Sequence, residues 1–181
     1  MYINEIKETF LDYPDDSSLA VIVFFEGCFW NCKDCQNKTL QKQNPEHKYH
    51  VIDAATIILD SLKRSKTNKL VLSGGDPFYN FNCAIRLIDY LSSRGIDICV
   101  YTGYSIDQIL SLYEKYEIAN QVGMHKPLWI KCGVFREDLK DPNMGKFADK
   151  FVLASTNQAF FKLNEKGEYV QMSNKNVLNY E

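Results

Sequence analysis

The chain has 181 residues, 45% of them hydrophobic, and a formal net charge of −2. This length and composition suit one compact domain over residues 1–181 with a substantial hydrophobic core. The charge argues against a basic nucleic-acid binder, and there is no polybasic run of the kind that binds membrane surfaces. The longest apolar run, residues 19–25, is too short to span a bilayer, and residues 1–5 lack the pattern of a secretion signal. We therefore expect a cytoplasmic protein with neither nucleic-acid nor membrane partners.

Strand-like and helical patterns alternate along most of the chain. Residues 19–25 are continuously apolar and rich in β-branched and aromatic side chains, which is typical of a strand buried on both faces. Ser105 and Gln108 can form a capping box for one helix, and Gly95 is placed to end another. The patterns predict strands at 19–25, 69–72, 96–101, 128–131 and 150–153, helices at 52–64, 84–91 and 106–113, a hairpin over 160–172 and a loop at 36–50.

This alternation predicts an α/β fold in which parallel strands are connected through helices. In such folds the functional residues gather at the carboxyl ends of the strands. Three of the expected strands end in short turns that carry Gly together with Cys or polar residues, at 27–28, 73–76 and 102–104. We therefore expect these three turns to form one site.

Three of the six cysteines, Cys28, Cys32 and Cys35, follow one another in a C-x3-C-x2-C spacing. In a reducing compartment, clustered cysteines are typical of metal ligands. Three thiolates on one short loop can ligate three irons of a cubane cluster and leave the fourth iron open. S-adenosylmethionine suits that open position, because its amino and carboxylate groups can chelate one iron. An electron from the cluster would then break a carbon–sulfur bond and release a 5′-deoxyadenosyl radical.

A zinc site is the main alternative for these cysteines, with Cys132 or His125 as the fourth ligand. Structural zinc sites usually combine two separate pairs of ligands, and no second pair follows here. The spacing therefore favours an iron–sulfur cluster. The remaining cysteines, Cys83, Cys99 and Cys132, are scattered, and we expect them to pack as small hydrophobic side chains.

Gly74, Gly75 and Asp76 form a turn between an expected strand and an expected helix. Two glycines let the backbone approach a ligand closely and present its amide groups. The Asp76 carboxylate can accept a hydrogen bond from an ammonium group. Beside the three cysteines, this turn is a candidate for binding the methionyl amino group of S-adenosylmethionine.

The cysteine triad and the Gly-Gly-Asp turn together resemble the radical SAM superfamily, whose corresponding turn is commonly Gly-Gly-Glu. Within that superfamily, the chain is similar to the anaerobic ribonucleotide reductase activating proteins. Four stretches carry this similarity, at residues 27–37, 72–77, 101–104 and 155–158. The sequence departs from the family pattern at residues 13–17, at Asp34 in place of a frequent aromatic residue, and at residues 132–135, where the family usually has Asp-Gly-x-Phe.

The resemblance implies an incomplete (β/α) barrel of parallel strands that holds one [4Fe–4S] cluster and S-adenosylmethionine. It implies that the enzyme takes a hydrogen from a glycine of an anaerobic ribonucleotide reductase and leaves a glycyl radical. A low-potential electron donor would supply the electron. Asp34, Gln36 and Thr102 would contact S-adenosylmethionine together with the turn at 74–76, and no catalytic residue is expected beyond the cluster ligands.

Two other functions stay open at this point. One is a radical SAM enzyme that modifies a small molecule such as a nucleoside, which would need polar groups around the reacting carbon. The other is a zinc- or cluster-binding module without catalytic activity. A protein partner is favoured because the chain is short and has no second cysteine cluster, so a peptide loop can enter an open end of the barrel. We expect Phe160 and Phe161 to be exposed and to contribute to that interface.

Overall fold

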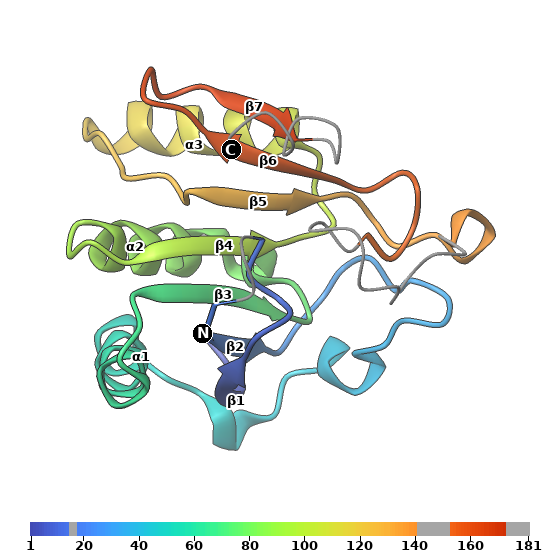
Figure 1. Cartoon of the computed structure of the whole chain (residues 1–181), viewed down its shortest axis with the longest axis horizontal. Helices are drawn as coiled ribbons and strands as arrows, with labels where there is room; N and C mark the ends of the chain where they lie inside the picture. The colour runs from blue at the N-terminus through green and yellow to red at the C-terminus, as the bar shows by residue number, and fades with distance from the viewer. Residues whose placement is uncertain (15–17, 141–152, 173–181) are drawn as a thin grey trace.

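The computed structural model describes residues 1–14, 18–140 and 153–172, and this part of the chain forms one seven-stranded sheet in the order β1-β2-β3-β4-β5-β6-β7 (Figure 1). The strands are β1 (Ile3–Thr9), β2 (Ala20–Phe25), β3 (Lys69–Gly74), β4 (Asp97–Tyr101), β5 (Trp129–Cys132), β6 (Ala159–Leu163) and β7 (Tyr169–Met172). The α-helices are α1 (Val51–Ser65), α2 (Phe81–Ser92) and α3 (Ile106–Asn120), with short 3-10 helices at Lys38–Gln41, Pro45–His47, Pro77–Asn80 and Glu137–Leu139. The predicted α/β class is confirmed.

The four central strands, β2 to β5, are parallel, as the alternation predicts. In contrast, β1, β6 and β7 pair antiparallel with their neighbours, so the predicted parallel strands form only the centre of the sheet. The length of the connecting segment explains part of the difference, because two parallel neighbours need a connection of a dozen or more residues between them. Only residues 164–168 join β6 to β7. The finer expectation of an incomplete barrel stays a prediction.

The sequence patterns predict most of these elements but miss β1. That strand lies at the edge of the sheet, and most of its side chains are exposed or half-buried and polar, so it lacks an apolar signal. The hairpin of β6 and β7 is confirmed. Apart from Leu153, the strand expected at 150–153 lies outside the described residues.

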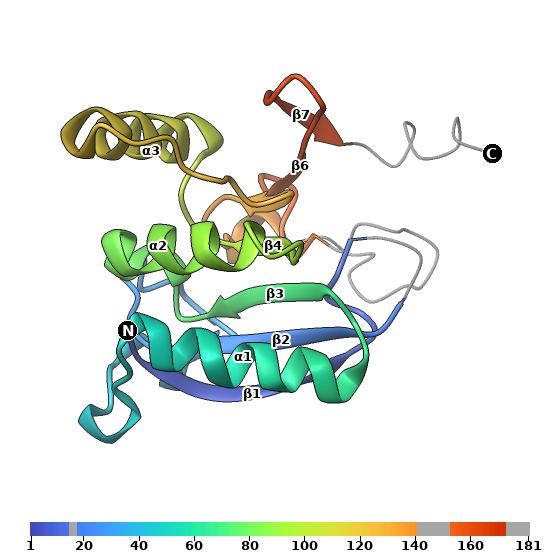
Figure 2. The same cartoon turned by 90° about the vertical axis from the view of Figure 1, so that its left-hand side faces the viewer.

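All three α-helices contribute to the core on one face of the sheet, and Figure 2 shows α1 and α2 side by side. This core includes Ile58 of α1, Ile88 of α2 and Ile109 of α3, packed with Val23 of β2. The neighbouring Ile22 belongs to a second hydrophobic cluster, to which none of the three helices contributes a buried residue. β2 is therefore buried on both faces, as its continuous apolar run predicts.

The start of α3 is fixed by two hydrogen bonds that involve side chains. At its start, the Ser105 hydroxyl accepts a hydrogen bond from the backbone N–H of Gln108 at 3.2 Å, and the Gln108 side chain accepts one from the Ser105 N–H at 2.8 Å. The predicted capping box is therefore confirmed.

No α-helix in the described ranges is long and apolar enough to cross a membrane.

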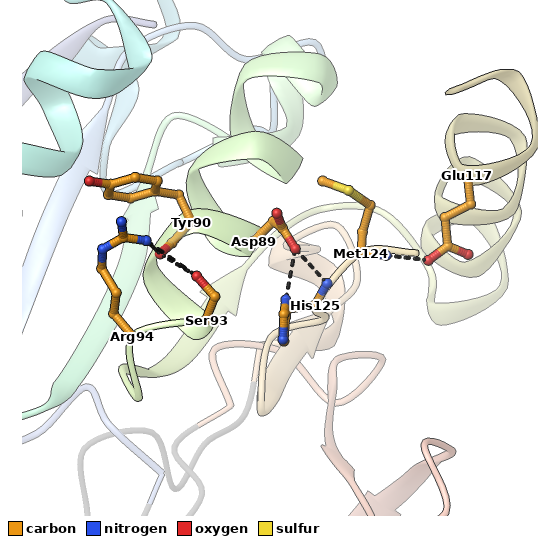
Figure 3. Close-up of polar contacts among 7 residues, drawn as sticks. All are labelled: Asp89, Tyr90, Ser93, Arg94, Glu117, Met124 and His125. Atoms are coloured by element: carbon orange, nitrogen blue, oxygen red, sulfur yellow. Dashed lines mark hydrogen bonds and ion pairs between the residues drawn. The ribbon is translucent and has the colours of Figure 1, made fainter. Parts of the chain in front are cut away.

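The segment between α3 and β5 is tied back to two helices (Figure 3). Asp89 of α2 accepts a hydrogen bond from the backbone N–H of His125 at 2.8 Å, and Nδ1 of His125 lies 2.8 Å from the same oxygen. Glu117 of α3 accepts a hydrogen bond from the backbone N–H of Met124 at 3.0 Å. His125, weighed above as a zinc ligand, is therefore engaged with α2.

Candidate metal centre

The carboxyl ends of β2 to β5 meet at one edge of the sheet, where the register pairs Phe25 with Gly74. An open cavity of about 160 Å³ lies at this edge, and Cys28, Cys32 and Cys35 all line it. Its other lining residues are Trp30, Gln36, Asn37, Ser73, Gly74, Gly75, Tyr101, Thr102, Gly103, Lys131, Gly133, Val134, Phe135, Ala154 and Gln158. The three strand-end turns of the sequence analysis therefore do meet at one place.

The three cysteines lie on residues 26–37, which we call the cysteine loop. Backbone φ is positive at Gly27 (98°), Asn31 (44°) and Asp34 (54°). Asn and Asp enter this left-handed region more readily than other residues with a side chain, because their short polar groups can bond locally. Asp34, a departure from the family pattern, thus suits the backbone conformation at its position. The cysteines form no disulfide and are half-buried.

Backbone N–H groups reach two of the three sulfurs. Burial raises the pKa of the Cys28 thiol, and a hydrogen bond from the Trp30 backbone opposes this. Burial likewise raises the pKa of Cys32, with a backbone hydrogen bond from Phe135 in the opposing direction. An N–H donor stabilises the negative sulfur of a metal-bound thiolate, and such bonds help to set the reduction potential of iron–sulfur clusters.

The glycine turn, residues 73–77, packs directly against the cysteine loop. The Gly75 N–H donates to the Phe25 carbonyl and the Asp76 N–H donates to the Gly27 carbonyl, both at 2.8 Å. A Cβ atom on Gly75 would lie 2.4 Å from the Gly27 oxygen and 2.7 Å from the Leu40 oxygen. The glycine pair was predicted to leave room for a ligand. Gly75 does line the cavity, and the missing side chain also makes room for the protein's own backbone.

Asp76 follows the two glycines of the turn and is only 2% exposed. Its carboxylate accepts hydrogen bonds from Trp30 Nε1 at 2.7 Å and from the backbone N–H groups of Phe78 and Gly103, each at 2.9 Å. The Thr102 hydroxyl donates to it at 3.0 Å. Burial raises the pKa of Asp76, and these donors oppose the rise. The carboxylate is thus already engaged by protein donors and does not line the cavity.

Comparison with known proteins identifies the family. The family model described as "4Fe-4S single cluster domain" matches residues 18–158. The chain belongs to this family. The anaerobic ribonucleoside-triphosphate reductase-activating protein of Escherichia coli K12 is 28% identical over 139 residues, covering 74% of this chain and 86% of the relative. Proteins of the same name from Vibrio cholerae and bacteriophage T4 are also similar. The Vibrio cholerae protein is 32% identical over 105 residues, which cover 55% of this chain and 67% of the relative. The phage protein is 26% identical over 105 residues, which cover 56% of this chain and 67% of the relative. The resemblance to the activating proteins is confirmed.

Cys28, Cys32 and Cys35 lie within the residues that the 4Fe-4S cluster family model matches, and they line one cavity. Within the described ranges, no three His, Cys, Asp or Glu side chains converge as ligands of a single metal ion. A cubane does not require this, because each of its thiolates binds a different iron. Cys132, the other fourth ligand considered for zinc, is 4% exposed in the helical-side core, where burial raises its pKa to about 12. Cys99 is also buried, whereas Cys83 is half-buried.

The remaining predicted contacts divide into two groups. Gln36 and Thr102 line the cavity, whereas the exposed side chain of Asp34 does not. Sequence reasoning gives no role to Gln158, which also lines the cavity. Its side chain donates to the Gly133 carbonyl at 2.9 Å and accepts from the Ala154 N–H at 3.0 Å. The stretch 155–158 that resembles the family therefore fixes the segment before β6 against the end of β5.

Lys131 is a further cavity residue without a sequence signal. Its ammonium lies 4.8 Å from the ring centroid of Tyr101 and 5.8 Å from that of Phe160. Burial lowers the pKa of Lys131 to about 8. The expectation that Phe160 is exposed is wrong: it is 2% exposed, because β6 turns it toward Tyr101 in the second hydrophobic cluster, and Phe161 is half-buried.

Glu26, the first residue of the cysteine loop, holds this end of the loop in place. The sequence patterns do not indicate this role. Glu26 is 6% exposed and accepts hydrogen bonds from the Asn44 backbone N–H at 2.6 Å and from Asn4 Nδ2 at 3.1 Å. His47 Nδ1 lies 2.7 Å from the same carboxylate. Burial alone would raise the pKa of Glu26, but these contacts outweigh it and hold the pKa below its ordinary value of 4.5.

Glu26→Gln is expected to lower the free energy of unfolding of the cluster-free protein at pH 7 by about 1–3 kcal/mol, because buried donors lose a charged acceptor. Since the folded-state pKa is depressed, this stabilisation is present above pH 4.5 and is lost as the pH falls through the lower folded value. Urea unfolding at a series of pH values should therefore show the difference between the two proteins narrowing below pH 4.5.

Glu5→Gln is the matched control, because Glu5 lies on β1 with a side chain that is 51% exposed and pairs with Lys7. It should change stability by less than about 0.5 kcal/mol. A pH-independent difference for Glu26→Gln would contradict the proposed ionisation of Glu26.

Proposed function

We propose that this chain is a single radical SAM domain that activates an anaerobic ribonucleotide reductase in the cytoplasm. In this proposal Cys28, Cys32 and Cys35 hold a [4Fe–4S] cluster, S-adenosylmethionine is cleaved reductively, and a glycyl radical is left on the reductase. The observation that carries the proposal is the meeting of three free cysteines and the glycine turn at one cavity, in a chain whose relatives are named reductase-activating proteins.

The chain's own residues have separate tasks in this proposal. The three thiolates bind three irons, and the N–H groups of Trp30 and Phe135 stabilise two of the sulfurs. When bound, the cluster supplies the electron that splits S-adenosylmethionine into methionine and the 5′-deoxyadenosyl radical. Because the Thr102 hydroxyl donates to Asp76, Thr102 would contact S-adenosylmethionine through its backbone, and Gln36, which also lines the cavity, would be a second contact.

The overall reaction balances with one electron from a low-potential donor. That electron and S-adenosylmethionine give methionine and the 5′-deoxyadenosyl radical, which takes a hydrogen atom from the glycine and becomes 5′-deoxyadenosine. The four parallel strands with helices on one face support an incomplete barrel. The opposite face would then border the space where the glycine reacts.

The proposal is tested by mixing the reduced enzyme, S-adenosylmethionine and the candidate reductase without oxygen and recording an electron paramagnetic resonance spectrum. We expect the doublet of a glycyl radical, and its loss when the acceptor glycine of the reductase is replaced by alanine. Formation of 5′-deoxyadenosine without a protein radical would instead favour a small-molecule substrate. Zinc without iron or sulfide in the purified protein would favour a binding module.

A further inference from the structure

Asp76 connects three segments that form the site. One donor, Trp30 Nε1, comes from the cysteine loop at 2.7 Å. Two more, the Thr102 hydroxyl and the Gly103 N–H, come from the end of β4 at 3.0 and 2.9 Å. The Phe78 N–H belongs to the 3-10 helix that follows the glycine turn. A single buried carboxylate therefore holds the cysteine loop, the glycine turn and the β4 end in one arrangement.

Trp30 is the one side chain of the cysteine loop in this set, and its position is closely constrained. A Cβ atom on Gly103 would lie 2.4 Å from Nε1 and 2.5 Å from Cδ1 of the indole, so the ring lies directly on this glycine. On another side the ring meets Tyr104 edge-on, with centroids 4.9 Å apart and planes at 83°. The absence of a side chain at position 103 is what allows the indole N–H to reach Asp76.

The same residue also reaches the metal centre. Trp30 lies between Cys28 and Cys32 in sequence, its backbone forms a hydrogen bond with the Cys28 sulfur, and the residue lines the cavity. Breaking the Trp30–Asp76 bond would leave the cysteines on their loop, because the backbone bond between the Asp76 N–H and the Gly27 carbonyl persists. Loss of the Trp30–Asp76 bond would instead allow the cysteine loop to move relative to the end of β4.

We infer that Trp30 is a positioning residue that sets the cysteine loop against the glycine turn and the β4 end through Asp76, and so determines how tightly S-adenosylmethionine binds. The inference rests on the proposed function. It also gives Asp76 a different task from the one expected from the sequence: its carboxylate orients the protein around the cofactor instead of accepting from the cofactor's ammonium group.

Trp30→Phe tests this inference, because it keeps an aromatic ring and removes the N–H donor. In the reconstituted holoenzyme, iron and sulfide content and the resting cluster spectrum should match the native protein. The dissociation constant for S-adenosylmethionine should rise about tenfold to a hundredfold, as for a lost charge-assisted hydrogen bond. The change that S-adenosylmethionine causes in the electron paramagnetic resonance spectrum of the reduced cluster should be diminished or altered in shape.

Trp129→Phe is the control, since Trp129 is the other of the two tryptophans and packs in the second hydrophobic cluster. It should bind S-adenosylmethionine as the native protein does. It also leaves Trp30 as the sole indole fluorophore, whose emission in the cluster-free protein should shift to longer wavelength when Asp76→Asn is added. In the holoenzyme, Trp30→Phe should have much less effect on affinity in the Asp76→Asn background, because Asp76→Asn has already removed the charge that strengthens the bond from Trp30.

Native affinity in Trp30→Phe, or independent effects of Trp30→Phe and Asp76→Asn, would overturn the inference while leaving the proposed function intact. Failure of the native holoenzyme itself to bind S-adenosylmethionine would overturn the proposed function, and the inference with it.

Discussion

Replacing Cys28, Cys32 or Cys35 by Ala is expected to abolish the cluster, with loss of its visible absorbance and of S-adenosylmethionine cleavage after anaerobic reconstitution. Each substitution leaves two thiolates at the cavity, too few to hold three irons. Iron and sulfide analysis, the absorbance spectrum and a 5′-deoxyadenosine assay measure the result. The expected effect is a complete loss in each of the three variants.

Three matched controls come from the remaining cysteines. Cys83→Ala, Cys99→Ala and Cys132→Ala should keep iron, sulfide and cleavage, because none of these residues lines the cavity. Loss of the cluster in Cys132→Ala alone would show a fourth protein thiolate and contradict an open iron. Retention of the cluster in any of the first three variants would contradict the assigned ligand set.

Gly75→Val is expected to destabilise the cluster-free protein by about 3 kcal/mol or more and to prevent most of the cluster from assembling. The new Cβ would lie 2.4 Å from the Gly27 oxygen, directly before Cys28, so the cysteine loop must move. Urea unfolding measures the first effect, and iron content after reconstitution measures the second.

Gly123→Val is the control for this steric argument, because nothing lies within 4 Å of a Cβ at that position and its φ is not in the positive range. It should change stability by no more than about 0.5 kcal/mol and leave the cluster intact. A Gly75→Val protein with a full cluster that binds no S-adenosylmethionine would indicate that the glycine makes room for the cofactor.

The elements that sequence patterns predict well are those with a strong apolar signal. β2 is continuously apolar and α2 repeats its apolar residues with helical spacing, so both are recognisable from local sequence. β1 escapes because an edge strand with charged side chains has no such signal. The direction of the strands at the two edges of the sheet also cannot be predicted from local sequence, because it depends on how the strands are connected and paired.

The site shows the same division. The cysteine spacing and the glycine pair are local patterns, and the structure brings both to one cavity. The partners of Asp76 are not local: Trp30 lies 46 positions before it and Gly103 27 positions after it. The reason for Gly75, close contact with the Gly27 carbonyl, likewise depends on tertiary structure. The residue types therefore predict the kind of site, whereas the contacts of an individual side chain such as Asp76 depend on the tertiary structure.

The glycine turn also helps to specify the alignment of the sheet. β2 reads AVIVFF and faces the equally apolar centre of β3, so a slip of one residue would exchange apolar side chains for other apolar side chains. In such a sheet, the burial of apolar side chains hardly favours one register of the two strands over another. Gly74, with φ of 108°, permits the observed register, because a Cβ there would lie 2.4 Å from the backbone N and O of Phe25. In the observed alignment Gly74, which has no side chain, lies opposite Phe25, and the N–H of Gly75 donates to the Phe25 carbonyl. The glycine turn that borders the cavity is therefore also part of the backbone contact between β2 and β3.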